Sequence, residues 1–394
     1  AVLPGAVVEL RDSVVRGNRA EPAVTVPSVR AKCPDGPCPF AQAAGGGIDN
    51  WGTLTLVRTT VSDNEAGGGL TAQANGGGIV SEQRSRLTLV DSTVTGNRAI
   101  AETDGRFASG GGIFVDRFGV LVLRGSVVSK NRSSLTSTYP KSVTEMNANS
   151  GGIYVGNGGS ATIERTAITG NVVTVEDLAG QPVGFDAGMC VCGPRTSLAL
   201  SHSTVANNRL AATVGTSTPA TGGSGGGLEA DGDATISDVR VTGNTVRVTS
   251  PDGVALAVAV VNLFAQGSKP AAVSDMVVSG NTVEAASTTG SARINGVGLA
   301  NNGPAVLTNV RIVGNRGRAT APAGWVHGGG IFNGLVFPRP RPALTLRDSS
   351  VTGNSVVASD GVVVQGAGLY TAGFRVTLGQ TEIARNSPDQ CHGC

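Results

Sequence analysis

The stretch that decides the fold is GGGIVSEQRSRLTLVDSTVTGNRA, residues 76–99. Three glycines lead into an isoleucine, a short apolar segment follows at Leu87–Leu89, and a second one ends at Gly96 and Asn97. Self-similarity of this kind, repeated every few tens of residues, is typical of solenoids. The terminal asparagine recurs in eleven copies, 32 to 46 residues apart: Asn18, Asn64, Asn97, Asn131, Asn171, Asn208, Asn244, Asn281, Asn315, Asn354 and Asn386.

Each unit holds two or three short apolar segments separated by turn residues. Segments such as Leu87–Leu89 alternate apolar and polar residues, which predicts strands, and no segment has a convincing helical period. A unit this small cannot bury its own apolar face, so the copies must stack as a parallel coil. We therefore expect a single all-β domain over residues 1–394.

Two apolar columns should line the interior of the coil. The first follows the LTL segment: Leu10, Leu56, Leu89, Leu123, Ile163, Leu200, Ile236, Val273, Leu307, Leu346 and Leu378. The second follows the glycines: Ile48, Ile79, Ile113, Ile153, Cys190, Leu228, Leu263, Leu299, Ile331 and Leu369.

The recurring asparagine predicts a structural ladder. Asn tolerates the left-handed backbone conformation that a sharp corner needs, and its amide can bond the asparagines one turn above and below. The glycines form a strip that is almost free of side chains. Such a strip lets something lie close to the backbone, either a loop of the chain itself or an outside ligand.

At this level of detail the repeats resemble a known family. Blocks such as GGGID and GGGIF, paired with corners such as TVTGN, resemble the GGAI and FxxN repeats of the chlamydial polymorphic outer-membrane proteins, with Val or Ile in place of Phe. The resemblance implies a single-stranded right-handed parallel β-helix of about 11 coils with long edge loops. It also implies a surface-exposed, adhesive role. Other right-handed β-helices are polysaccharide lyases, glycoside hydrolases and phage tailspikes.

Charge and hydropathy restrict the partners. The formal net charge of +2 provides no basic surface for nucleic acid. The longest apolar run, GVALAVAVVNLFAQG, is too short to span a bilayer. The chain begins with Ala1, which removal of a signal peptide or trimming would explain. We expect a secreted or cell-surface protein whose ends favour end-to-end self-association.

The six cysteines form three close pairs. Cys33/Cys38 and Cys391/Cys394 flank turn residues and predict small disulfide loops in an oxidising compartment, with metal ligation as the weaker interpretation. Cys190 and Cys192 place both sulfurs on one face of a strand. That spacing favours buried free thiols over a disulfide.

The residue after each glycine block should point outward. In ten copies this column contains five aromatic residues, in a chain with only 4% aromatics. It predicts either a ladder on which sugar rings stack or a face buried beneath edge loops. The ligand-binding candidates from this column are Phe114, Tyr154, Glu229, Phe332 and Tyr370, and the other members are Asp49, Val80, Val191, Phe264 and Ala300.

Two polar clusters are candidate catalytic sites. Arg165, His202 and Asp238 follow the LTL strand on successive turns, next to Asp275, and could perform acid–base chemistry on a uronic acid or bind Ca²⁺ through the aspartates. Ordinary turn residues are the alternative. Glu82 and Asp116 follow the glycine block on adjacent turns and could form a glycosidase pair, or a solvated surface pair.

No nucleophile motif, phosphate-binding loop or metal triad is present in the sequence, and no cofactor is predicted. The leading hypothesis is therefore a binding or adhesive β-helix directed at glycans or surface polysaccharide. The alternatives are a carbohydrate-active enzyme with a groove site on the coil, and a structural filament or coat protein.

Overall fold

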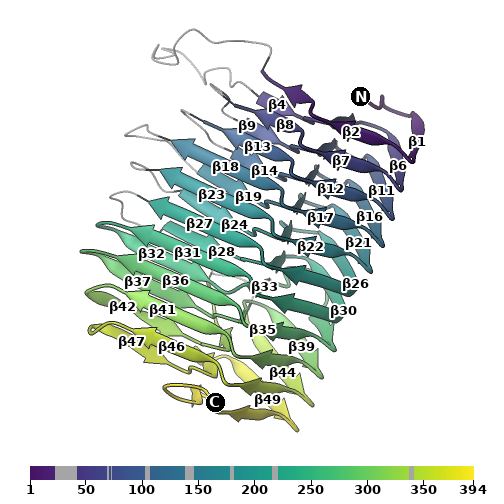
Figure 1. Cartoon of the computed structure of the whole chain (residues 1–394). Helices are drawn as coiled ribbons and strands as arrows, with labels where there is room; N and C mark the ends of the chain where they lie inside the picture. Colours follow the sequence, from purple (N-terminus) through teal and green to yellow (C-terminus); the bar gives the residue numbers. More distant parts are fainter. Residues whose placement is uncertain are drawn as a thin grey trace.

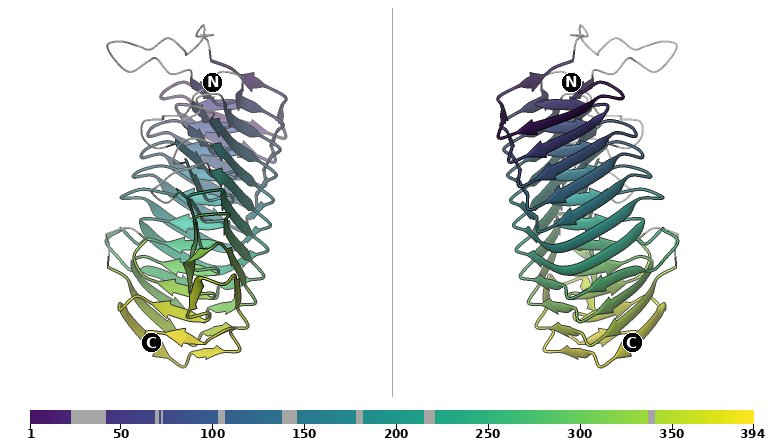
Figure 2. Two further views of the ribbon diagram at one scale, coloured as in Figure 1. Left: turned by 90° about the vertical axis from the view of Figure 1, so that its left-hand side faces the viewer. Right: turned by 90° about the vertical axis from the view of Figure 1, so that its right-hand side faces the viewer.

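The computed structural model forms one parallel β-helix (Figures 1 and 2). It describes residues 1–22, 42–68, 71, 73–102, 107–137, 146–177, 182–214, 221–336 and 341–394. The turns stack from the N-terminus at the top of Figure 1 to the C-terminus at the bottom. Every strand pairing is parallel, as stacked copies of one repeat require.

Four sheets run along the solenoid. Sheet A contains 11 strands, in the order β5 (Ile48–Asn50), β10 (Ile79–Ser81), β15 (Ile113–Val115), β20 (Ile153–Val155), β25 (Met189–Val191), β29 (Leu228–Ala230), β33 (Val261–Leu263), β38 (Leu299–Asn301), β43 (Ile331–Asn333), β48 (Leu369–Thr371) and β51 (Cys391–His392). These short strands follow the glycine blocks.

Sheet B contains 20 strands in two parallel runs joined through two long strands. The first run is β1 (Val7–Arg11), β6 (Thr53–Val57), β11 (Arg86–Val90), β16 (Val120–Arg124), β21 (Ser160–Glu164), β26 (Ser197–Ala206), β30 (Asp233–Thr242), β34 (Ala271–Ser274), β39 (Pro304–Thr308), β44 (Ala343–Arg347) and β49 (Arg375–Gly379). The second run shares β26 and β30 and adds β2 (Val14–Arg16), β7 (Thr60–Ser62), β12 (Thr93–Thr95), β17 (Val127–Ser129), β22 (Ala167–Thr169), β35 (Val277–Ser279), β40 (Arg311–Val313), β45 (Ser350–Thr352) and β50 (Glu382–Ala384).

Sheets C and D contain 10 strands each and flank the edge loops. Sheet C is β3 (Arg19–Ala20), β8 (Glu65–Gly67), β13 (Arg98–Ala101), β18 (Arg132–Ser137), β23 (Val172–Asp177), β27 (Arg209–Val214), β31 (Thr245–Ser250), β36 (Thr282–Ser287), β41 (Arg316–Thr320) and β46 (Ser355–Ala358). Sheet D is β4 (Gln42–Ala44), β9 (Gln73–Asn75), β14 (Phe107–Ser109), β19 (Met146–Asn149), β24 (Pro182–Phe185), β28 (Thr221–Ser224), β32 (Val254–Val258), β37 (Ser291–Asn295), β42 (Ala323–His327) and β47 (Val362–Gln365).

The core is the inside of the coil. In one turn, Ile79, Leu87, Leu89, Val94 and Ala99 point inward from three sheets and are fully buried. The first predicted column is confirmed in register from Leu10 to Leu378. Its members are buried except in the end turns, where Leu10 is partly buried and Leu378 is 43% exposed. Among the described residues there is no helix, and so none that could cross a membrane.

The asparagine ladder runs the length of the solenoid. From Asn64 to Asn354 the side-chain amide donates to Oδ1 of the next ladder asparagine and to a backbone carbonyl of the turn before, as Asn171 does to Asn208 (2.9 Å) and to Val128 (3.0 Å). The backbone N–H donates to the same Oδ1. Gln390 continues the ladder beyond Asn386, because the Oε1 atom of Gln390 accepts a hydrogen bond from the backbone N–H of Asn386 (2.9 Å). These bonds satisfy backbone groups that would otherwise be buried without partners.

The left-handed residue at this corner is not the asparagine, so that part of the prediction is wrong. The residue before it has the positive φ, for example Gly96 (68°), Lys130 (55°) and Gly170 (65°). The asparagine itself must extend its side chain along the solenoid axis to reach the next one. The preceding residue therefore makes the turn, and glycine is favoured there.

The glycine triplets pack against the inside of the coil. The first glycine turns the chain, as Gly76 does with φ of 58°. A Cβ on the second, Gly77, would lie 2.3 Å from the backbone carbonyl of Arg98 in sheet C, and one on the third, Gly78, would lie 2.9 Å from the Asn97 amide. The bare strip is thus occupied by the ladder and by sheet C, and by neither of the two predicted occupants.

The second predicted column is wrong at two turns. Met189 and Val261 take the inward positions, in register with Leu228, and Cys190 points outward. In each turn one residue packs against the ladder and the next one points inward. In this turn Gly188 packs against the ladder, since a Cβ added to it would lie 3.0 Å from the Asn208 amide, and Met189 points inward. Both turns lack a glycine triplet in the sequence, so the repeat does not identify the inward residue there. Val191 and Phe264 consequently leave the outward column, which Cys190 and Asn262 enter.

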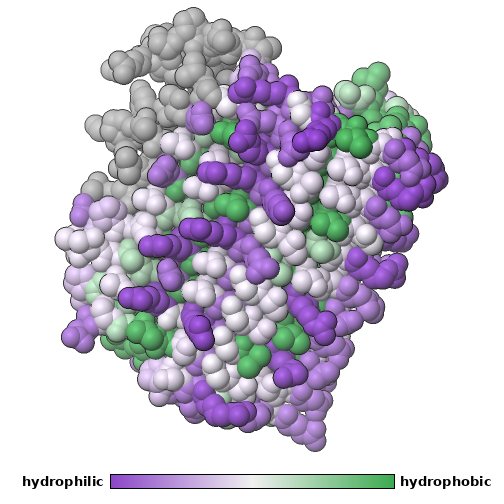
Figure 3. All heavy atoms as spheres, in the orientation of Figure 1, coloured by the Kyte–Doolittle hydropathy of each residue, from purple (hydrophilic) through white to green (hydrophobic). Residues whose placement is uncertain are grey.

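Charged side chains are dispersed over the face formed by sheets B, C and D. In Figure 3, hydrophilic residues alternate with small and apolar ones on this face. Many are paired across turns: Arg19 with Glu65 at 3.2 Å, and Arg247 with Glu284 at 3.7 Å. Exposed pairs of this kind contribute little to stability.

Candidate functional site

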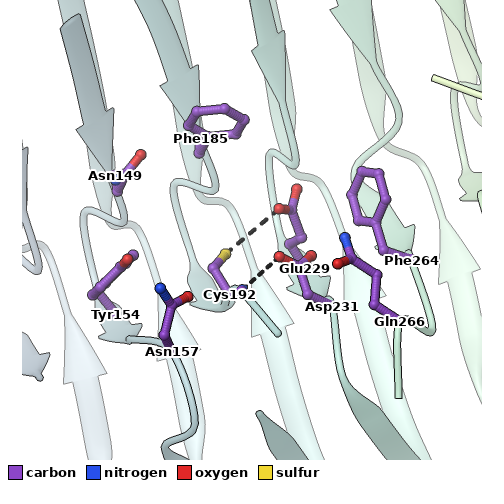
Figure 4. Close-up of a pocket in the computed structure, with 10 residues that line it drawn as sticks. Asn149, Tyr154, Asn157, Phe185, Cys192, Glu229, Asp231, Phe264 and Gln266 are labelled. Atoms are coloured by element: carbon purple, nitrogen blue, oxygen red, sulfur yellow. Dashed lines mark hydrogen bonds between the residues drawn. The ribbon is translucent and has the colours of Figure 1, made fainter. Parts of the chain in front are cut away.

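A pocket of about 260 Å³ opens beside the outward face of sheet A, midway along the solenoid. Tyr154, Cys190, Glu229 and Asn262 occupy one outward column on the successive strands β20, β25, β29 and β33. Ten residues line the pocket: Asn149, Tyr154, Asn157, Phe185, Cys192, Gly193, Glu229, Asp231, Phe264 and Gln266. Figure 4 labels all of them except Gly193 and shows that they come from neighbouring turns.

Glu229 forms the floor of the pocket and is only 4% exposed. Its Oε2 accepts from the Ser224 hydroxyl (3.0 Å) and the Asn262 amide (3.3 Å), and Asn262 also donates to Ser224 (2.7 Å). Its Oε1 faces the Cys192 sulfur at 3.5 Å. Burial, followed by the charge of Asp231, raises the pKa of Glu229 well above its usual range.

Asp231 stands next to Glu229 on the pocket wall. Its Oδ2 accepts from the Gly193 backbone N–H at 2.6 Å, and its other oxygen has no hydrogen-bond partner. Burial raises its pKa to about 6, against the opposing effect of that N–H. A third carboxyl group, Asp186, is fully buried behind the pocket, and burial with the charges of Glu229 and Asp231 raises its pKa well above normal.

Aromatic and amide groups form the rest of the wall. Burial raises the pKa of Tyr154 to about 12, and its ring stacks on Phe114 with centroids 5.1 Å apart. Phe185 and Phe264 lie on the opposite side in Figure 4, and Asn149, Asn157 and Gln266 supply amides. The pocket therefore combines apolar faces with neutral and acidic hydrogen-bonding groups.

The cysteine pairs differ from the prediction at one place. The structure joins Cys190 to Cys192 in a disulfide, where the sequence favoured free thiols. The sulfurs do share one face, and their Cα atoms are 5.3 Å apart, within the range of a disulfide. Cys391 is joined to Cys394. Cys33 and Cys38 lie outside the described residues.

The predicted Arg165–His202–Asp238 cluster lies at an exposed corner of sheet B, away from the pocket lining. His202 Nε2 is 3.9 Å from Asp238 Oδ2, with both side chains more than half exposed. Arg165 bonds its neighbour Glu164. Asp275 bonds Asn309 (2.6 Å). All of these corner residues except Glu164 have a left-handed φ near 50°, which accounts for Asp and Asn at this position.

The structure brings Glu82 and Asp116 together near Asp49. Burial, then the charges of Asp49 and Asp116, raise the pKa of Glu82 to about 7. Glu82 is about half buried, so this is a partly solvated acidic group.

The predicted ligand residues fall into two groups. Tyr154 and Glu229 line the pocket. Phe332 and Tyr370 belong to a second stack, in which Tyr370 lies 4.1 Å from His327 and 5.2 Å from His392 by ring centroids. Rings in both groups stack on rings of adjacent turns, Tyr154 on Phe114 and Phe332 on Tyr370.

Sequence reasoning missed Asp186, Ser224 and Asn262. Asp186 takes the corner position that is glycine in most other turns, with φ of 46°. Asn262 lies in the turn that has no glycine block before its strand of sheet A. Both are departures from the repeat, which was the available signal.

Comparison of the chain with protein-family models, curated proteins and solved structures finds no match.

Proposed function

We propose that this protein is a secreted or cell-surface β-helix that binds glycans, and that the pocket takes one sugar residue. The observation that carries this proposal is the acidic and amide floor between aromatic walls. Sugars present hydroxyl groups on their edges and C–H groups on their faces, and binding sites match both with a few polar groups among apolar ones. A cavity of about 260 Å³ suits a single ring.

The charge of the pocket selects the sugar. Its lining includes Glu229 and Asp231 and neither lysine nor arginine, and Arg117 acts on Tyr154 from outside the lining. An anionic sugar would bring a charge into a partly buried site whose described lining offers no cation, which costs free energy. The preferred ligand is therefore a neutral sugar or an amino sugar, and a uronic acid is disfavoured.

An adhesive role agrees with the resemblance of the GGGI and TVTGN repeats to the polymorphic outer-membrane proteins. It also agrees with the rigid, repetitive scaffold, which presents one face along its whole length.

One observation favours an enzyme as the second candidate. The carboxyl groups of Glu229 and Asp231 are neighbours in the same pocket, and paired carboxyl groups perform glycoside hydrolysis. The exposed corner at His202 and Asp238 has no comparable enclosure.

A glycan array followed by calorimetry on the full chain tests the proposal. We expect binding to neutral or amino-sugar glycans, weakened about tenfold or more by Asn157→Ala or Gln266→Ala, since each removes a polar contact. His202→Ala is the control and should bind normally. Binding confined to uronate glycans, or unaffected by both pocket variants, would refute the proposal. Release of reducing ends that is lost in Glu229→Gln would favour the enzyme.

A further inference from the structure

Four potential metal ligands converge behind the pocket. One oxygen each from Asp186 and Glu229 and the sulfurs of Cys190 and Cys192 all lie within 4.8 Å of one another. Asp186 precedes β25, Cys190 lies in it, Cys192 follows it, and Glu229 comes from β29 on the next turn. Three of the four residues are fully or almost fully buried.

Asp186 is the unexplained member of this cluster. It is fully buried, and among the described residues neither of its carboxylate oxygens has a fixed donor, the carboxyl group of Glu229 being the neighbour with which it can share a proton. The charged groups that act on it are the carboxyl groups of Glu229 and Asp231. Burying a carboxylate without a donor or a cation is costly, and buried carboxylates are normally paired or coordinate metals.

The corner glycine of the next turn, Gly225, leaves room for this side chain. A Cβ on Gly225 would lie 1.4 Å from Asp186 Oδ1, so any other residue at that position would displace the carboxylate. The Cβ would also lie 3.3 Å from the Asn262 amide. The chain therefore keeps a glycine where Asp186 extends over the backbone toward Glu229.

Glu229 is already oriented as a metal ligand would be. Ser224 and Asn262 both donate to its Oε2, which fixes the carboxylate and leaves Oε1 toward Cys192. Such outer hydrogen bonds are characteristic of metal-ligating carboxylates. The 3.5 Å between Cys192 Sγ and Glu229 Oε1 also fits, because two ligands of a tetrahedral zinc ion stand about 3.3–3.8 Å apart.

We propose that, in the dithiol form, Asp186, Cys190, Cys192 and Glu229 bind one divalent cation of the zinc class. A thiol reductant supplies two electrons and two protons to the Cys190–Cys192 disulfide and becomes a disulfide itself; a phosphine supplies the two electrons, while water supplies the two protons and the oxygen of the phosphine oxide. The cation then displaces the two thiol protons, together with any proton held by Asp186 or Glu229, and is held by two thiolates and two carboxylates. Thiolate donors select zinc-class cations over Ca²⁺ and Mg²⁺, which prefer oxygen.

The site is redox-responsive, since the same two sulfurs cannot form the disulfide and ligate the cation. It departs from the prediction of no metal site, because only the folded register brings Asp186 and Glu229 to the cysteine pair. It does not rest on the proposed glycan binding, although Glu229 and Cys192 line the pocket as well.

The test uses the full chain with Cys33, Cys38, Cys391 and Cys394 changed to Ser, so that Cys190 and Cys192 are the remaining thiols. After reduction with a phosphine under anaerobic conditions, Co²⁺ is titrated and the thiolate-to-metal charge-transfer absorption is followed, with Zn²⁺ as competitor. We expect one Co²⁺ per chain, displaced by Zn²⁺. Asp186→Asn in the same background should weaken binding about tenfold or more.

A second measurement guards against loss of the fold in the Ser background. In the unmodified chain, Zn²⁺ should raise the melting temperature after reduction and leave it unchanged before reduction. The same shift should persist in Cys391→Ser/Cys394→Ser and be smaller in Asp186→Asn. Absence of charge-transfer absorption, or equal affinity with and without Asp186, would overturn the proposal, as would a melting shift that is undiminished in Asp186→Asn.

Discussion

Substitution of a central ladder asparagine should destabilise the solenoid far more than substitution at its end. Asn171 is fully buried and takes part in four side-chain hydrogen bonds. Its amide donates to Val128 O and Asn208 Oδ1, and its Oδ1 accepts from the backbone N–H and the amide of Asn131. Asn171→Ala removes all four.

The cost follows from the groups that are left without partners. The Asn131 backbone N–H and the Val128 carbonyl each lose the partner that the ladder gave them, whereas the Asn131 amide keeps Val94 O at 3.0 Å. Each orphaned buried group costs about 1–3 kcal/mol, and the cavity adds to this. We expect a loss of about 3–6 kcal/mol, a large fraction of the stability of a typical domain.

Asn18 is the matched control. It is the exposed first member of the ladder and donates only to Asn64, so Asn18→Ala should cost about 1 kcal/mol or less. Urea unfolding followed by circular dichroism compares the two, and hydrogen exchange locates the loosened turns. Equal midpoints for the two variants would show that the ladder does not carry the stability assigned to it.

Three further predictions concern single positions. The pKa of Glu82 rises from 4.5 to about 7 on folding, so the free energy of unfolding should fall between these pH values. Glu82→Gln should remove the loss, about 1–2 kcal/mol at pH 8 after discounting for half exposure, with no difference from the parent at pH 4 in urea titrations. Gly112→Ala places a Cβ 2.8 Å from a backbone carbonyl and 2.9 Å from the Asn131 amide, so it should lower the free energy of unfolding by about 2–4 kcal/mol. Gly379→Ala is the control and should change it very little, because the nearest atom to a Cβ there is 3.8 Å away. Gln390→Ala leaves the backbone N–H of Asn386 without its acceptor. Hydrogen exchange should then accelerate at the C-terminal turn alone, and uniform acceleration would count against a capping role for Gln390.

The sequence allowed the interior to be predicted wherever the repeat is regular. The ladder and the LTL column rest on side chains whose positions follow from stacking alone, so eleven copies over-determine them. The reason for the glycine triplets was harder to predict from the sequence, because the atoms that exclude a side chain there belong to other residues. What excludes a side chain at Gly78 is the amide of Asn97, nineteen positions later in the chain and adjacent only in the fold.

The site could be predicted only in part, for a related reason. Glu229 and Tyr154 were found because they occupy a repeating outward position. Cys190 was assigned to the interior, since a slip of one residue moves a strand side chain to the opposite face. Asp186 carries no local signal of burial, because its environment is made by Gly225 and Glu229 on the following turn.

The departures from the repeat coincide in space, and this argues that they serve one site. Asp186 replaces a corner glycine, Cys190 replaces an outward side chain with a sulfur, and the following turns contribute Glu229 and Asn262. Random drift in a solenoid would scatter such changes, since each turn contacts only its neighbours and tolerates substitution independently. Here they occupy consecutive turns on one face, share hydrogen bonds and bury three carboxyl groups together. Unpaired buried acids reduce stability, so their concentration beside a pocket is more readily explained by a ligand than by the requirements of the coil.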